Sequence, residues 1–209
     1  MNFKELFNSP KVIAVIGDIN EAKSNLLYHL IEELKKEGIF TLYTYGLKKE
    51  VPEAITIHSI EELEQVRNSI VVLDEIMSLW NLDDKMARRK IEKSLRLIFH
   101  NNNILVICAV PENIRKFIAG KINIYFFKKV TISDFINGSR AKKVITNYKG
   151  SEVGSSVLNL KKEEAILFDG LHYTKLKIPY YEKYDSKKNN EDIIKKVNEK
   201  VNENKENIK

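Results

Sequence analysis

The sequence is poor in cysteine and has no long apolar run. Its single cysteine, Cys108, lies inside the apolar stretch ILVICAV, which excludes an intrachain disulfide and favours a small core residue over a reactive thiol. The N-terminal residues MNFKELFNSPK lack the apolar segment of a secretory signal. No apolar run approaches the roughly 20 residues that span a bilayer. We therefore expect a soluble, cytoplasmic protein without a membrane span.

Patterns typical of metal centres and hydrolase triads are also missing. The four histidines show no metal-ligand spacing, and a single cysteine cannot form a zinc cluster. No Ser-His-Asp arrangement stands out, and no internal repeat is visible. We therefore expect neither a structural zinc module nor a repeat array.

What the chain does contain is enough apolar material for one ordinary domain. Apolar residues make up 43% and aromatic residues 9% of the 209 residues, which excludes wholesale disorder. Thirty-five Lys and Arg residues against 29 Asp and Glu residues give a net charge of +6. This surplus is compatible with a polyanionic partner such as nucleic acid or a nucleotide, and equally with a lysine-rich solvated surface.

Short apolar runs alternate with helical patterns along most of the chain. Strands are predicted at 12–16, 39–45, 55–57, 69–73, 104–110 and 122–127. Helices are predicted over 23–37, 59–66, 83–100, 111–119 and 132–147. The alternation indicates βαβ units, and it therefore predicts an α/β fold with a mainly parallel sheet flanked by helices.

The pattern changes after residue 150. Two apolar runs, 164–168 and 171–178, are joined by Asp-Gly, which predicts a β-hairpin with a two-residue turn at the edge of the sheet. From Ser186 the sequence is polar, and its few apolar residues fall near a heptad seam. A frayed helical tail is favoured there over a partner-docking helix. We thus expect one domain over 1–185, which includes the hairpin, and a charged tail over 186–209.

One segment resembles a phosphate-binding loop. The pattern G-x-x-x-x-G-K-[ST] is matched at three of its four defining positions by Gly17, Lys23 and Ser24, between a predicted strand and a predicted helix. Backbone N–H groups of such a loop surround phosphates, its lysine neutralises them, and its hydroxyl ligates Mg²⁺. The expected nucleotide-binding residues are Gly17, Asp18, Ile19, Asn20, Glu21, Ala22, Lys23, Ser24 and Asn25.

Two features of this loop depart from the pattern. Ala22 replaces the second glycine; if residue 22 has positive φ, the alanine costs on the order of 1 kcal/mol, and if φ is negative it matters only through crowding. Asp18 and Glu21 add negative charge beside the expected phosphates, at roughly 1–3 kcal/mol for a carboxylate about 6 Å away. The alternative interpretation is an ordinary strand-to-helix turn that happens to contain Lys-Ser.

A second segment supports the nucleotide interpretation. The apolar strand 69–73 is followed directly by Asp74 and Glu75, and ends of parallel strands share the edge at which ligands bind. We expect Asp74 to hold Mg²⁺ through water beside Ser24. Glu75 is the expected catalytic residue, which polarises or positions the attacking water.

These segments give the chain a resemblance to the FtsK/HerA group of P-loop motor ATPases, and in particular to the small packaging ATPases of membrane-containing viruses. The resemblance covers about residues 11–180. It rests on GDINEAKS, on IVVLDE, on ILVICAVPENIRKFIAGKINIYFF and on the hairpin EEAILFDGLHYTKLKIP. It implies a P-loop NTPase fold, ATP and Mg²⁺ as cofactors, and a homo-oligomeric ring that moves double-stranded DNA. Members usually place a polar sensor near the position of Val110, where this chain has an apolar residue.

Further residues have two interpretations each. An arginine finger from a neighbouring subunit could be supplied by Arg88, Arg89, Arg96, Arg115 or Arg140, although each is more typical of a solvated surface. The cluster at 139–143 could contact DNA phosphates, and the pair Lys128-Lys129 could do so or could be a solvated strand end. Tyr180, Tyr181 and Tyr184 could stack on bases or pack the hairpin, and Trp80 could line the site or anchor its loop.

Three functions remain open from the sequence. The first is an ATPase motor acting on DNA in packaging, conjugation or segregation. The second is a degenerate P-loop subunit with a regulatory or structural role, which Glu21, Ala22 and Val110 favour. The third is a small-molecule kinase, for which the segment 132–150 is the one candidate lid and against which the hairpin argues.

Overall fold

The computed structural model describes residues 7, 9–37, 41–47, 49–74, 85–111, 120–130 and 156–181. Its strands are β1 (Val12–Ile16), β2 (Thr41–Tyr45), β3 (Ile55–Thr56), β4 (Ser69–Leu73), β5 (Ile104–Ala109), β6 (Ile124–Phe127), β7 (Glu164–Phe168) and β8 (Tyr173–Lys177). Its helices are α2 (Lys23–Glu37), α3 (Ile60–Leu63) and α5 (Lys85–His100). The expected helices over 111–119 and 132–147 and the tail over 186–209 lie almost wholly outside the described residues.

The strands form one sheet in the order β3-β2-β4-β5-β1-β6-β7-β8. Along this order, every neighbouring pair from β3 at the edge as far as β6 is parallel. Strand β6 then pairs antiparallel with β7, and β7 pairs antiparallel with β8. Strand β1 therefore lies in the middle of the sheet, between β5 and β6. The predicted α/β fold, with a mainly parallel sheet and a C-terminal hairpin, is confirmed.

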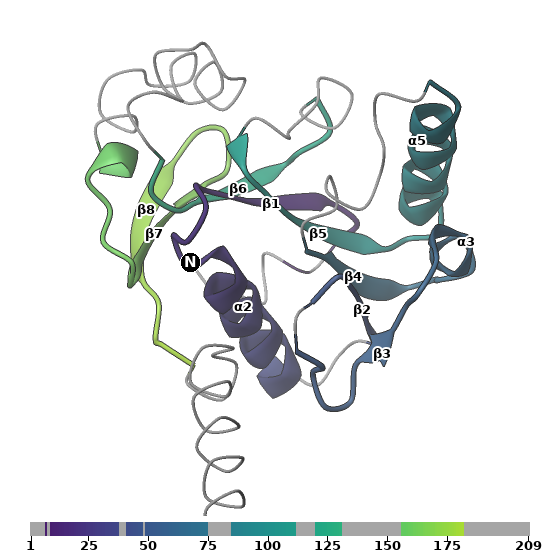
Figure 1. Cartoon of the computed structure of the whole chain (residues 1–209), viewed down its shortest axis with the longest axis horizontal. Helices are drawn as coiled ribbons and strands as arrows, with labels where there is room; N and C mark the ends of the chain where they lie inside the picture. The colour runs from purple at the N-terminus through teal and green to yellow at the C-terminus, as the bar shows by residue number, and fades with distance from the viewer. Residues whose placement is uncertain are drawn as a thin grey trace, which may run out of the picture.

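Helices cover both faces of the sheet (Figure 1). Alternate residues of β1 belong to two separate cores, because successive side chains of a strand point to opposite faces. Ile13 and Val15 pack in the core that includes the apolar face of α2. The other residues of β1 pack in the core with Leu63 of α3 and Leu95 of α5. The continuous apolar runs β1, β4 and β5 are buried throughout, as strands covered on both faces must be.

Several element ends differ from the prediction for local reasons. Helix α3 is capped by the Ser59 side chain, which accepts from Glu62 N–H at 3.3 Å, but it ends at Leu63, before the predicted residue 66. The backbone beyond it closes into i→i−3 hydrogen bonds, the tighter turn that often finishes a helix. Strand β6 begins two residues later than predicted, where the Asn123 side chain accepts from Val12 N–H at 2.8 Å in place of a ladder bond.

The turn of the hairpin was predicted wrongly. Phe168 pairs with Tyr173, so the loop contains four residues and not two. The carboxylate of Asp169 accepts from the N–H groups of Leu171 at 2.8 Å and His172 at 2.7 Å. A side chain that satisfies two loop donors stabilises a longer loop, in the manner of an Asx-turn, and Gly170 supplies the positive φ of 98° within it.

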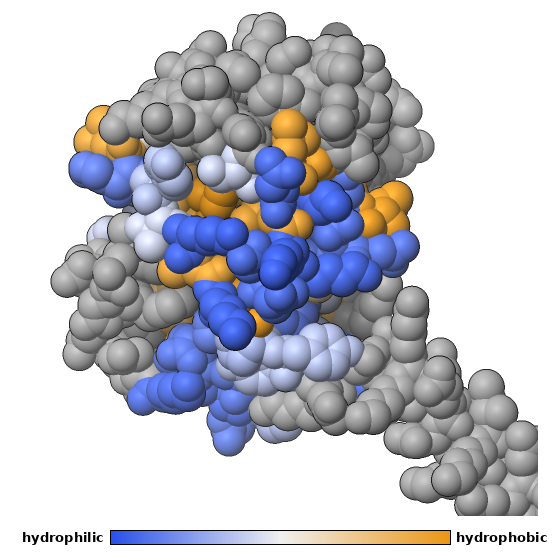
Figure 2. Space-filling model, turned by 90° about the vertical axis from the view of Figure 1, so that its left-hand side faces the viewer, coloured by the Kyte–Doolittle hydropathy of each residue, from blue (hydrophilic) through white to orange (hydrophobic). Residues whose placement is uncertain are grey.

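The side of the molecule that carries the hairpin is mostly hydrophilic among the coloured residues of Figure 2. Strand β8 is the last strand of the sheet, and its Lys175 and Lys177 are exposed. Lysines on an edge strand oppose pairing with another chain. Among the helices that the structure describes, none has the length and apolar character needed to cross a membrane.

Candidate functional site

The loop over 17–22 leaves the central strand β1 at the carboxyl edge of the sheet and leads directly into α2. Its first residue is fitted against the neighbouring strand. A Cβ built on Gly17 would lie 2.5 Å from Lys128 Cβ and 3.3 Å from Lys128 Cα. Asp18 N–H also donates to the carbonyl of Lys129 at 3.0 Å. The loop is therefore anchored to the residues that follow β6, and only glycine fits at its start.

The middle of the loop alternates in backbone conformation. Asn20 has φ 65° and Ala22 has φ 58°, whereas Glu21 and Lys23 are not in the left-handed region. Successive residues of alternating hand turn their N–H groups toward one concavity, which favours an anion. Ala22 thus occupies the backbone conformation that a glycine adopts freely, and a non-glycine residue there costs about 1–2 kcal/mol.

Lys23 and Ser24 begin α2 at this concavity. The Lys23 side chain is 8% exposed, and its ammonium donates to the carbonyl of Asp18 at 2.7 Å, so the loop folds around its own lysine. Ser24 Oγ donates to Asp74 Oδ2 at 3.2 Å. Asp74 follows β4, is 1% exposed and is held by its backbone N–H, which donates to Tyr45 O at 2.9 Å. The structure thus brings Asp74 to Ser24, which lies 50 positions away in the sequence and directly follows Lys23.

This arrangement fits a magnesium ion that is bound partly by protein oxygens and partly by the phosphate oxygens of a nucleotide. Within the described residues, no group of three or more His, Cys, Asp or Glu side chains could hold a metal. A serine hydroxyl and a carboxylate supply hard oxygen ligands, and Mg²⁺ is commonly bound by one or two such groups together with phosphate oxygens and water. Asp18 and Glu21 are half-buried in the same loop, so their charges oppose phosphate binding unless a cation or Lys23 compensates them.

Other residues expected at the site are only partly placed. Glu75 lies outside the described residues, as do Trp80, Arg115, Arg140 and Tyr184. Arg89 and Arg96 lie on α5 and are exposed. Val110 directly follows β5 and is half-buried, so it does lie at the edge of the sheet where the expected polar sensor would stand.

Lys128 was not singled out from the sequence as part of this site. The sequence predicts a basic pair that either contacts DNA or is a solvated strand end, but the Lys128 side chain is 1% exposed and, of the two lysines, only Lys129 is exposed. Its ammonium donates to the carbonyls of Lys162 at 2.5 Å and Glu164 at 2.6 Å. Burial lowers the pKa of Lys128 to about 8, although Glu21 and the acids near β7 favour its charged form. The one signal in the sequence is that Lys128 follows directly on a fully buried strand.

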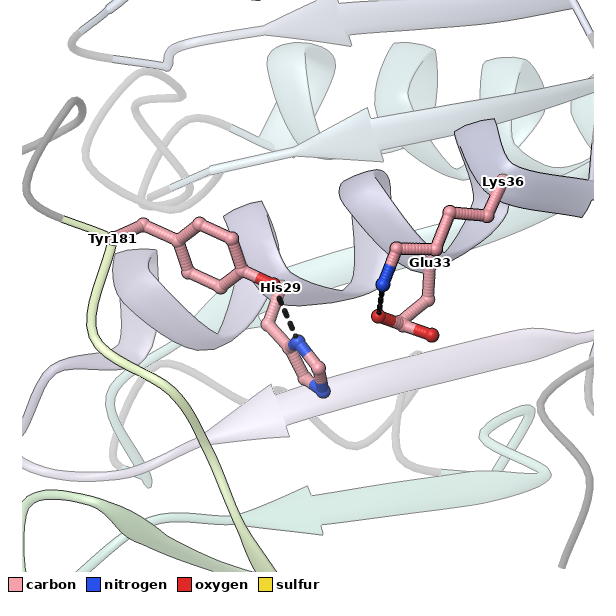
Figure 3. A network of polar contacts seen from close by, with 4 residues as sticks. All are labelled: His29, Glu33, Lys36 and Tyr181. Carbon is pink, nitrogen blue, oxygen red and sulfur yellow. Dashed lines mark hydrogen bonds and ion pairs between the residues drawn. The ribbon is translucent and has the colours of Figure 1, made fainter.

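Two side chains of α2 bind the segment that follows β8. The side-chain amide of Asn25 donates to Pro179 O at 2.9 Å and accepts from Tyr181 N–H at 2.9 Å. One turn later, His29 Nδ1 lies 3.0 Å from the Tyr181 hydroxyl (Figure 3). Tyr181 therefore contacts α2, which neither of the two interpretations from the sequence had included. Tyr180 is 60% exposed.

The fold and the loop together define the class: an α/β protein with the P-loop NTPase fold. No protein-family model matches the chain, and no curated protein matches its sequence. Solved structures do match. The genome packaging NTPase B204 from Sulfolobus turreted icosahedral virus 2, in complex with sulfate, gives a TM-score of 0.60 at 13% identity and covers 83% of this chain and 100% of its own.

Two further structures match in the same way. The DNA-packaging ATPase B204 from Sulfolobus turreted icosahedral virus gives a TM-score of 0.59 at 11% identity, over 82% of this chain and 100% of its own. The pCW3 conjugation coupling protein TcpA, with ATPγS, gives 0.54 at 16% identity, over 87% of this chain and 62% of its own. These matches are at 11–16% identity and show a shared fold, so the P-loop NTPase fold that the resemblance implies is confirmed.

Proposed function

We propose that this chain binds ATP with Mg²⁺ at the loop over 17–24 and uses it as an ATPase motor acting on double-stranded DNA. The observation that supports binding most directly is the meeting of Ser24 and Asp74 at 3.2 Å beside the buried Lys23. An ordinary strand-to-helix turn does not require the hydroxyl of the second helix residue to lie against a buried carboxylate that follows another strand. The matches to a DNA-packaging ATPase and to a conjugation coupling protein support the motor.

Each residue has a distinct role in this proposal. The N–H groups of 17–24 would surround the phosphates, and the helix dipole of α2 would add favourable potential. Lys23 would exchange the carbonyl of Asp18 for the β- and γ-phosphates. Ser24 and Asp74 would hold Mg²⁺, which supplies charge neutralisation on the phosphate oxygens when bound. Glu75 would orient and polarise the attacking water.

The first experiment separates binding from turnover. Purified protein is titrated calorimetrically with ATP and ADP in the presence of Mg²⁺. We expect saturable binding that Lys23→Ala weakens at least tenfold. Lys35→Ala, on the last turn of the same helix, serves as the control with unchanged binding. Absence of ATP and ADP binding at millimolar concentrations would refute the proposal.

The second experiment tests hydrolysis and DNA. Glu75→Gln should abolish phosphate release and leave ATP binding intact, because the amide keeps the shape but cannot accept a proton. Double-stranded DNA should stimulate the rate, and this stimulation should fall steeply with salt if phosphate contacts carry it. Mass photometry with ATP and DNA would test assembly into a ring. DNA that leaves the rate unchanged at low salt would remove the motor from the proposal.

A second candidate function is a nucleotide-binding subunit without turnover. The observations that favour it are the left-handed Ala22 and the apolar Val110 at the edge of the sheet. Its signature is ATP binding with no phosphate release in the wild type, so that Glu75→Gln changes nothing in any assay. The candidate lid of the kinase alternative, at 132–150, lies outside the described residues.

We also propose that residues 1–185 form the NTPase domain and that 186–209 form an appended tail. A chain that ends at residue 185 should keep the melting temperature and ATP affinity of the full chain. A large drop in either would place the tail within the domain. A motor of this kind would work in the cytoplasm, where ATP and DNA are both available.

A further inference from the structure

The segment 178–181 is the last part of the chain that the structure describes, and it returns from the hairpin to the first turn of α2. Ile178 is 2% exposed, and its N–H donates to Glu163 O at 2.6 Å. The next residues leave the sheet and run along α2, on which Lys23 and Ser24 stand. A segment from the far end of the chain is therefore fixed beside the phosphate loop.

Asn25 fixes the backbone on both sides of Tyr180. Its amide donates to the carbonyl of residue 179 and accepts from the N–H of residue 181, which is the pattern that one residue of a parallel strand makes with its neighbour. The two hydrogen bonds leave the backbone of Tyr180 little freedom. Asn25 directly follows Ser24, so the side chain that anchors the segment comes from the residue next to the proposed phosphate and Mg²⁺ ligands.

His29 adds a second attachment point on the same helix. Its Nδ1 lies 3.0 Å from the Tyr181 hydroxyl, with the two rings 5.9 Å apart, while Glu33 and Lys36 pair one turn further along (Figure 3). Burial lowers the pKa of His29, which favours a neutral ring at neutral pH. Tyr181 thus contacts α2, and the adjacent Tyr180 is the exposed aromatic residue of the segment.

We infer that Tyr180 is the base-stacking residue of the proposed nucleotide site, held in place by Asn25. The inference rests on the proposed function. The proposed loop holds phosphates between Gly17 and Ser24, and we place the nucleoside beside the first turn of α2, where Asn25 anchors the segment. Tyr180 is 60% exposed although its backbone is anchored. An exposed aromatic side chain on an anchored backbone can stack on a base at little entropic cost.

Asn25 acts through Tyr180 and is a positioning residue. The ligand class that this pair would select is a nucleoside triphosphate over an inorganic polyphosphate. Since every base has a π-face, stacking adds affinity without choosing strongly among bases. In this proposal Asn25 and Tyr180 contribute affinity for the nucleoside, whereas Lys23 and Ser24 contribute affinity for the phosphates.

The test compares two probes, ATP and inorganic tripolyphosphate, each with Mg²⁺, in calorimetric titrations. Tyr180→Ala should weaken ATP binding by about 5- to 100-fold and leave tripolyphosphate binding within about twofold. Tyr180→Phe should bind ATP like the wild type, because the ring and not the hydroxyl stacks. Tyr173→Ala is the matched control, since Tyr173 is a partly exposed tyrosine on β8. Asn25→Ala should weaken ATP more than tripolyphosphate, and its melting temperature shows whether the fold is kept.

The outcomes separate this inference from the proposed function. Wild-type protein that binds neither probe refutes both. Wild-type protein that binds both, with Tyr180→Ala binding ATP equally well, refutes the stacking role alone. A variant that loses ATP and tripolyphosphate in equal measure also refutes it, because Tyr180 would then support the loop and not the base.

Discussion

Replacing Ala22 by glycine should stabilise the protein. Ala22 has φ 58° at the end of the phosphate loop, directly before α2, and its carbonyl accepts from Leu26 N–H at 3.2 Å. This bond requires residue 22 to keep its place at the helix start, so the loop cannot relax the residue without giving up the first turn. Glycine adopts the same backbone conformation without the clash between Cβ and the carbonyl oxygen.

The size of the effect follows from two opposing terms. The left-handed conformation costs an alanine about 1–2 kcal/mol. Glycine loses more freedom on folding, at about 0.5–1 kcal/mol. The net gain is about 1 kcal/mol, which for a chain of 209 residues raises the melting temperature by about 2–4 °C.

The assay is thermal and urea unfolding without ligand, with two control substitutions. Ala54 lies outside the left-handed region, so Ala54→Gly should destabilise the protein by about 0.5–1 kcal/mol. Asn20→Gly, at φ 65°, should gain less than Ala22→Gly, because asparagine tolerates this conformation. If Ala22→Gly destabilises the protein as Ala54→Gly does, residue 22 is not held in the left-handed conformation, and the reasoning fails.

Three further changes test the neighbourhood of the loop. Gly17→Ala should destabilise by about 1–3 kcal/mol in urea unfolding, because its Cβ would lie 2.5 Å from Lys128 Cβ; a neutral result would show that the loop can move off β6. Ser24→Ala should remove the Mg²⁺-dependent part of ATP affinity, so titrations with and without chelator should coincide. Lys128→Met should abolish a rise in stability between pH 8 and 10.5. With a pKa of about 8 against an ordinary 10.5, the folded wild type binds fewer protons than the unfolded chain in that window, and it gains up to about 3 kcal/mol as pH rises.

The central part of the fold could be predicted because its sequence signals are local. Strands β1 and β5 are short runs of apolar residues, β4 is apolar after Ser69, and α2 places its leucines at helical spacing. Each signal is complete within one element, so no knowledge of its neighbours was needed. The same holds for the order of strand, loop and helix around Lys23 and Ser24, which predicts the candidate site.

The remaining features depend on contacts between distant segments. Lys128 is buried because the carbonyls of residues 162 and 164 receive its ammonium, and nothing near Lys128 in the sequence reveals them. Asn25 and Tyr181 are 156 positions apart. The hairpin loop has four residues because the carboxylate of Asp169 binds two of its N–H groups, a choice that Asp-Gly alone leaves open.

The two glycine positions of the loop pattern illustrate why one could be lost and the other kept. At residue 17 the obstacle is another atom: Lys128 Cβ stands where the alanine methyl would go, and Lys128 itself is buried and anchored through its ammonium. Relief there would require β1 and β6 to separate. At residue 22 the obstacle is torsional, local and worth about 1 kcal/mol net, and the side chain is only half-buried. A folded chain tolerates the second kind of cost far more easily than the first. The presence of Ala22 is therefore compatible with a phosphate loop that keeps its shape, and the effect of Ala22 on ATP affinity should be small beside that of Lys23.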